Sequence, residues 1–302
     1  MSQSQLNEIK PSFSGHDTFP LRQLWLKKSY DEIRPQSPKS ERKILSDDDS
    51  IVRFGVGKNM VKAIRHWSLA ADIIQENGLY LQTTSLGDLI FGEKGLDPYQ
   101  ESETTSWLIH WKLAGEAKKT TTWFWLFNLI IEPTFDKKFL QDKLIRYAND
   151  LGDKSSETTL KRDLDCCLRT YLPKDIKVTP EEINDTVLGD LNIIQQVGRG
   201  KYEFIRGDKP SLSNALFIYS LIKFWEIYSP NQQSMSFDTI MHENRSPGRV
   251  FKLDEESVAE RLSSIDTITK RKLIWSDSQG IRSILRNDEN IDPYEILRMA
   301  YE

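Results

Sequence analysis

Apolar residues recur with the period of an α-helix between residues 57 and 74. The opposite face of this segment carries Lys58, Lys62 and Arg65, and no Asp or Glu lies between Arg53 and His66. The pattern therefore predicts an amphipathic helix that begins near Gly57 and has a basic face without acids. The apolar positions share a face about 80° wide at about 100° per residue: Met60, Ile64, Trp67, Ala71 and Ile74.

The segments around this helix predict a compact unit. A helix is expected over Pro20–Ile33, a hairpin with strands Asp72–Gln75 and Leu79–Gln82, and a further helix over Thr83–Phe91. Helix, short helix, basic helix and hairpin is the order of a winged helix-turn-helix, whose basic helix enters the DNA major groove. The residues expected to contact DNA in this unit are Arg53, Lys58, Asn59, Lys62, Arg65 and His66.

The same order recurs twice along the chain. In the second copy, helices are expected over residues 137–151, 155–172 and 181–191, followed by a hairpin that turns at Gly198-Arg199-Gly200. The third copy covers residues 236–285, with a helix near 254–265 and two strands within 272–285. The DNA-contact candidates of the two copies are Lys161, Arg162, Arg169, Arg199, Lys201, Arg245 and Arg249.

These elements predict a mainly α protein with small β-hairpins, in which tandem winged helix-turn-helix units are joined by a helical middle segment. Three domains are expected, at residues 1–100, 101–210 and 211–302. The tryptophans of the middle and of the segment 210–228 are expected to be core anchors rather than platforms for stacking bases. They are Trp107, Trp111, Trp123, Trp125 and Trp225.

Composition narrows the class of protein further. The chain has 302 residues, 28% of them charged, and a net charge of −4, which is typical of a soluble globular protein. No apolar run approaches the roughly 20 residues of a membrane span, and no secretory signal is evident, so a cytoplasmic protein without membrane partners is expected. The adjacent Cys166 and Cys167 favour a half-buried pair on a helix over a disulfide or a zinc site.

The polar cluster Ser14–Thr18 is the first place to look for chemistry. His16 and Asp17 are the candidate catalytic pair, because consecutive residues of these types can share a proton or bind a metal. The competing interpretation is structural, with Asp17 or Thr18 capping the helix that follows and His16 in a structural hydrogen bond. No cofactor motif is evident, because the GVGK at residues 55–58 lacks the spacing of a phosphate loop.

Three long runs, FSGHDTFPLRQLWLKKSYD, VRFGVGKNMVKAIRHW and LGDLIFGEKGLDPYQE, resemble the bacterial family DUF4007. The resemblance extends through TTWFWLFN, TLKRDLDCCLRTYLP and SPGRVFKLD, and so covers nearly the whole chain. Members of this family, which includes SspB-like proteins, belong to DNA phosphorothioation (SspABCD) systems that act in antiviral defence. The resemblance implies a role in placing sulfur in the DNA backbone, with SspB-like proteins linked to DNA nicking.

The resemblance also implies partners: double-stranded DNA, a cysteine desulfurase, an ATPase and a reductase-like subunit, with oligomerisation left open. A divalent metal ion is expected only if the protein nicks DNA. Three functions remain open from the sequence. They are a DNA-binding component that also nicks its target, a non-catalytic winged-helix adaptor, and a winged-helix transcription regulator.

Overall fold

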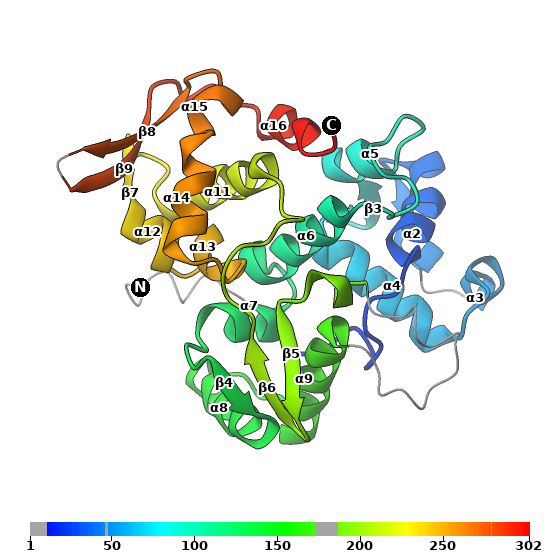
Figure 1. Cartoon of the computed structure of the whole chain (residues 1–302). Coiled ribbons are helices and arrows are strands. Elements are labelled where there is room, and N and C mark those ends of the chain that lie inside the picture. Colours follow the sequence, from blue (N-terminus) through cyan, green and yellow to red (C-terminus); the bar gives the residue numbers. More distant parts are fainter. Residues whose placement is uncertain (1–10, 46–47, 173–186, 279) are drawn as a thin grey trace.

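The computed structural model describes residues 11–45, 48–172, 187–278 and 280–302. These residues form a mainly helical protein with small antiparallel sheets of three strands each (Figure 1). None of the described helices is long and apolar enough to cross a membrane. The mainly α fold with small β-hairpins is thereby confirmed.

A first repeat occupies residues 25–83. Its hairpin turns at Gly78 and Leu79, because Asn77 pairs with Tyr80 and Gly78 has a φ of 57°. The elements are α2 (Trp25–Ile33), β1 (Ser40–Glu41), α3 (Asp48–Phe54), α4 (Lys58–Ala70), β2 (Ile74–Asn77) and β3 (Tyr80–Thr83), followed by α5 (Ser85–Phe91).

A second repeat occupies residues 121–204 and is preceded by α6 (Glu103–Trp111) and a π-helical turn (Lys112–Glu116). The helix expected over 181–191 lies mostly outside the described residues, and a 3₁₀ turn is found at Gly189–Leu191. The elements are α7 (Thr121–Asn128), β4 (Thr134–Asp136), α8 (Lys137–Asp150), α9 (Glu157–Tyr171), β5 (Ile194–Gly198) and β6 (Lys201–Phe204).

A third repeat occupies residues 214–286, and α16 (Pro293–Met299) follows it and packs against α11 (Figure 1). The elements are α11 (Asn214–Tyr228), β7 (Ser234–Ser236), α12 (Phe237–His242), α13 (Pro247–Val250), α14 (Glu255–Ser263), α15 (Ile265–Ile268), β8 (Leu273–Ser278) and β9 (Ile281–Arg286).

The three sheets have the same strand order. In each repeat a short first strand pairs antiparallel with the last strand of the hairpin, giving β1-β3-β2, β4-β6-β5 and β7-β9-β8. Each short strand follows one helix and precedes two or more others. The hairpins expected near residues 72–82, 193–205 and 272–285 are all present, although the first is shifted by about two residues.

The apolar side chains of the three repeats form one continuous core cluster. As the sequence predicts, all five tryptophans of the middle segment and of α11 are buried in it. Ser156, Ser213 and Asp254 cap α9, α11 and α14, each accepting a hydrogen bond from a backbone N–H of the first turn. Local capping and apolar periodicity together account for where these helices begin.

Three predicted features differ in the structure. The first helix begins at Trp25 rather than Pro20, because Leu24 has a left-handed backbone with a φ of 65° and the chain turns there. Asp72 is not in a strand: its φ is 62°, and its carboxylate is held by Lys112 at 3.2 Å and Lys118 at 2.7 Å. Cys166 and Cys167 are fully buried on α9 rather than half-buried, and burial raises the pKa of both thiols.

Candidate nucleic-acid interface

The exposed face of α4 carries the predicted basic residues of the first repeat. Lys58, Asn59 and Lys62 are exposed, and the apolar face of the helix is buried against the core. The Lys62 Nζ lies 3.7 Å from the Asp17 Oδ2, and Arg65 donates to the Glu76 Oε1 of the hairpin at 2.9 Å. The basic face predicted from periodicity is therefore present at the surface.

The loop before α2 joins α4 to α9 through His16. The His16 side chain is buried, its ring stacks on Trp67 of α4 at a centroid distance of 5.7 Å, and its Nε2 lies 2.5 Å from the Asp163 Oδ1 of α9. The Thr18 N–H donates to the His16 Nδ1 at 3.1 Å, which leaves the proton on Nε2 to be donated to Asp163. The second Asp163 oxygen accepts a hydrogen bond from the Thr122 hydroxyl.

These contacts test the structural interpretation of His16 and Asp17. Neither Asp17 nor Thr18 caps the next helix, which begins seven residues after Thr18, so the capping interpretation is wrong. The structural hydrogen bond expected of His16 is present, to Asp163. In the parts of the chain that the structure describes, no three His, Cys, Asp or Glu side chains are grouped so as to hold a metal ion.

The same loop links the surfaces of the two helices. Arg169 of α9 donates through its Nη2 to the Thr18 carbonyl at 2.5 Å, while Asp17, one residue earlier, faces Lys62 of α4. The turn at Asp17-Thr18 therefore lies between a cation of α4 and a cation of α9. The arrangement fixes α4 and α9 relative to each other.

The remaining candidates of the second repeat are mostly at the surface. Arg162 is exposed on α9, and Lys161 forms an exposed ion pair with Glu157 at 3.0 Å. Arg199 and Lys201 are exposed at the tip of the β5–β6 hairpin, where the sequence predicts them.

Three predicted contact residues use their donors within the protein. Arg53 binds Glu32 at 2.6 Å and the Ile44 carbonyl at 2.8 Å. Arg245 donates to the Gly115 and Glu116 carbonyls at 2.9 and 2.7 Å. Arg249 donates to the Asn128 and His242 carbonyls at 2.5 and 2.7 Å. Partial burial lowers the pKa of Arg245 and of Arg249, and both guanidinium groups are directed at backbone carbonyls.

His66, also a predicted contact residue, is buried. Its side chain is 8% exposed, and burial, with a further contribution from His16, lowers its pKa to about 3. The imidazole is therefore neutral at pH 7 and contributes no charge to the α4 face.

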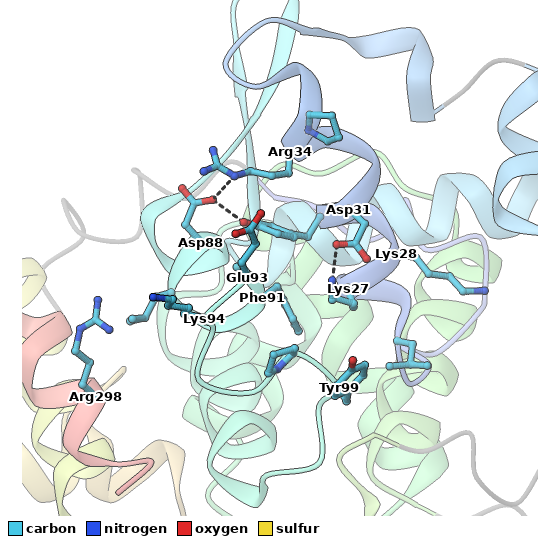
Figure 2. A pocket seen from close by; sticks show the side chains of 16 residues that line it. Lys27, Lys28, Asp31, Arg34, Asp88, Phe91, Glu93, Lys94, Tyr99 and Arg298 are labelled. Carbon is cyan, nitrogen blue, oxygen red and sulfur yellow. Dashed lines mark hydrogen bonds and ion pairs between the residues drawn. The ribbon is translucent and has the colours of Figure 1, made fainter.

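A large charged cleft of about 1240 Å³ lies elsewhere, lined by α2, α5, the segment that follows α5, and Arg298 of α16 (Figure 2). Much of its charge is paired within the cleft. The Arg34 Nε lies 3.5 Å from the Asp88 Oδ1, the Tyr30 hydroxyl donates to the same oxygen at 2.9 Å, and Lys27 binds Asp31. The cleft thus presents mixed charge rather than a continuous basic face, and nothing in the sequence pattern signals it.

Sequence reasoning also missed Asp163 and Thr122, which are hydrogen-bonded in the His16 cluster, and Lys119, whose positive charge helps to lower the pKa of His66. Asp163 lies on the buried side of α9 and is separated from His16 by 147 residues, so no local spacing connects the two. Lys119 is half-exposed in the short segment before α7, a segment that the sequence predicts to be part of a buried connection. In the sequence, Asp163 stands out only as an acidic residue on an otherwise apolar helix face.

The fold is similar to solved structures, and the sequence matches a protein family. Comparison with proteins of curated function found no match. A solved structure titled "SspB crystal structure" is 26% identical, with a TM-score of 0.87, over 99% of this chain and 90% of that chain. Another, titled "Magnesium ion-bound SspB crystal structure", is 27% identical, with a TM-score of 0.85, over 98% of this chain and 88% of that chain. The family described as "Protein of unknown function (DUF4007)" matches residues 13–301, and the chain therefore belongs to that family.

Proposed function

We propose that this protein is the DNA-binding component of a bacterial DNA phosphorothioate modification system. The observation that carries the proposal is the likeness to SspB over 98–99% of the chain at 26–27% identity. Replacing a phosphate oxygen with sulfur requires a subunit that holds the duplex and presents its backbone. Contacts to phosphate supply such positioning without reading sequence.

The repeated topology supports a second element of the proposal, that each repeat is a winged helix. In each, the short strand after the first helix pairs with the last strand of the hairpin, and helices lie between that strand and the hairpin. In a winged helix-turn-helix the last helix before the hairpin enters the major groove. Among the α-helices that the structure describes, α4 holds that position in the first repeat and α9 in the second.

The proposed DNA surface combines α4, the adjacent face of α9 and the β5–β6 hairpin. Because His16 contacts both Trp67 and Asp163, the two helices do not have to be ordered when DNA binds, which lowers the entropic cost of binding. The hairpin tip adds Arg199 and Lys201, in the place where a wing contacts phosphate. The proposed contact residues are Lys58, Asn59, Lys62, Arg65, Lys161, Arg162, Arg169, Arg199 and Lys201.

A magnesium-dependent nicking activity is the second candidate function, favoured by the magnesium ion in one of the SspB structures. Mg²⁺ is usually held by one or two carboxylates together with water and substrate phosphates. The described residues do not group three His, Cys, Asp or Glu side chains as a protein-only site. The DNA-binding proposal does not depend on a metal ion, and no catalytic step is assigned to one.

The test is duplex binding measured by fluorescence anisotropy across a series of salt concentrations. Binding that weakens linearly in log salt supports the proposal, since each neutralised phosphate adds about 0.9 to the slope. No binding at low salt contradicts it and favours the non-catalytic adaptor. Binding confined to one promoter-like sequence favours a transcription regulator.

Conversion of supercoiled plasmid to open circles, measured with Mg²⁺ and with chelator, separately decides the nicking candidate. Open circles that form with Mg²⁺ and not with chelator support nicking. Binding without any open circles contradicts it and leaves DNA binding in place.

A further inference from the structure

A small hollow lies between α4, the loop before α2 and the segment before α7. Its volume is about 280 Å³, enough for a phosphate group with part of a sugar, and it opens to solvent. The sequence pattern does not signal it, because its walls come from separate segments of the chain. The lining residues are Gly15, Leu45, Lys62, Arg65, His66, Leu69, Glu76 and Lys119.

The charge of the hollow favours an anion. Lys62, Arg65 and Lys119 line it, against one acid, Glu76. Glu76 is already compensated, because Arg65 lies 2.9 Å and Arg42 3.9 Å from its carboxylate. Lys62 also lies 3.7 Å from the Asp17 Oδ2, but Lys62, Arg65, Arg42 and Lys119 still outnumber the two carboxylates of Glu76 and Asp17, so positive charge is in excess at the mouth of the hollow.

His66 gives the hollow a polar wall. The side chain is buried, and its Nε2 has no hydrogen-bond partner among the described residues. A buried polar atom without a partner costs free energy unless a ligand or water satisfies it. The depressed pKa of His66, about 3 through burial, means that this wall offers a hydrogen bond rather than a charge.

Gly15 shapes the wall beside His66. Its φ is +113°, and a Cβ at this position would lie 2.5 Å from the His66 Nδ1. The backbone of the loop can therefore pack directly against the imidazole only because residue 15 is glycine. Close approach of a glycine backbone, a ring nitrogen and two lysines is a suitable setting for a compact oxyanion.

We infer that this hollow binds a phosphate group, held by Lys62 and Lys119 and by a hydrogen bond from His66. The inference rests on the proposed function, since a phosphodiester of bound DNA is one source of such a group and free phosphate is the other. In the DNA complex the hollow would position one backbone phosphate between α4 and the loop that carries His16.

The experiment compares Lys119→Gln with Lys118→Gln. The two residues are adjacent, but Lys118 binds Asp72 at 2.7 Å and does not line the hollow. Titration with inorganic phosphate is followed by the NMR signals of the His66 ring, and duplex binding is followed by anisotropy. In Lys119→Gln we expect the phosphate-induced shifts of His66 to be abolished and duplex affinity to fall about tenfold, with wild-type behaviour in Lys118→Gln.

The outcomes separate the two proposals. If the duplex binds with normal salt dependence, while phosphate moves no His66 signal and the two variants bind alike, the hollow proposal is overturned and DNA binding stands. If phosphate moves His66 in the wild type and not in Lys119→Gln, but no duplex binds, the hollow is a site for free phosphate and the DNA-binding proposal is overturned. Thermal unfolding of each variant confirms that neither substitution disrupts the fold.

Discussion

The first and third repeats both carry candidate cations but use them differently. Lys58 and Lys62 of α4 extend from an exposed face, and the Lys62 ammonium lies 3.7 Å from the Asp17 carboxylate. Arg245 and Arg249 of the third repeat donate to backbone carbonyls of the central helices and of α12. Positive charge in a sequence therefore does not predict a positive surface, because arginine can satisfy carbonyls at the ends of other helices.

The physical reason lies in what surrounds each segment. The helical turn Lys112–Glu116 and the end of α7 leave carbonyls that no helical N–H can reach. The planar guanidinium of Arg245 reaches two of them while it packs on the Phe124 ring at 4.9 Å. Lys62 of α4 instead projects from an exposed helix face, where a ligand can reach it.

Among the substitutions of cationic residues, Arg245→Met should have the largest effect on stability. Methionine keeps the apolar contact with Phe124 but leaves the Gly115 and Glu116 carbonyls without their donor, so unfolding should cost about 3 kcal/mol less. Urea unfolding measures the change. The exposed Arg162→Met is the control, with an expected change below about 0.5 kcal/mol. Equal stability of the two variants would contradict a structural role for the hydrogen bonds of Arg245 to these carbonyls.

The next effect is on DNA binding and comes from replacing Lys58, Lys62 and Arg65 together by alanine. We expect affinity to fall about ten- to a hundredfold and the salt slope to fall by about one unit for each phosphate that is no longer neutralised. Anisotropy over a salt series measures both, with circular dichroism as the check on folding. The control removes Lys27, Lys28 and Lys94 from the large cleft, the same charge in another place (Figure 2). If the control weakens binding and the α4 variant does not, the DNA surface lies at the cleft.

How much of this difference could be predicted depends on the range of the interactions. The 3.6-residue periodicity correctly placed α4, α8 and α9, since burial of one helix face is set by local sequence. The link from His16 to Asp163 spans 147 residues, and the hydrogen bonds of Arg245 to Gly115 and Glu116 span 130 and 129, so no local pattern contains them. Backbone strain was equally invisible: Leu24 has a left-handed φ although its sequence suits a helix. The sequence therefore predicts the basic face of α4 but not the hollow beside it.

The pH dependence of stability should show whether His66 and His110 are buried as neutral groups. Burial lowers the pKa of both His66 and His110 from 6.5 to about 3. Between these values the unfolded chain binds protons that the folded protein does not, so stability is full above pH 6.5 and is lost as the pH falls towards 3. The expected loss is about 1.4 kcal/mol per pH unit for each histidine. Urea unfolding at pH 7, 6 and 5 measures it, and His66→Gln should make the slope shallower by one histidine's share. A flat profile in the wild type would show that the two imidazoles are not buried as neutral groups.

The smallest expected effect concerns Asp17. It compares the surface ion pair of Asp17 with the buried hydrogen bond of the neighbouring His16. Asp17 caps no helix, and its ion pair with Lys62, at 3.7 Å between partly exposed side chains, should contribute well under about 1 kcal/mol. Asp17→Asn and Asp17→Ala should therefore both unfold within about 0.5 kcal/mol of the wild type. His16→Ala should lower stability far more, because it leaves Asp163 buried without the imidazole N–H.

Removing the Asp17 charge should also strengthen duplex binding slightly, since Lys62 is then released to the phosphate backbone. A loss of plasmid nicking in Asp17→Asn, with affinity and melting temperature unchanged, would instead assign Asp17 a catalytic role that its position beside Lys62 does not require.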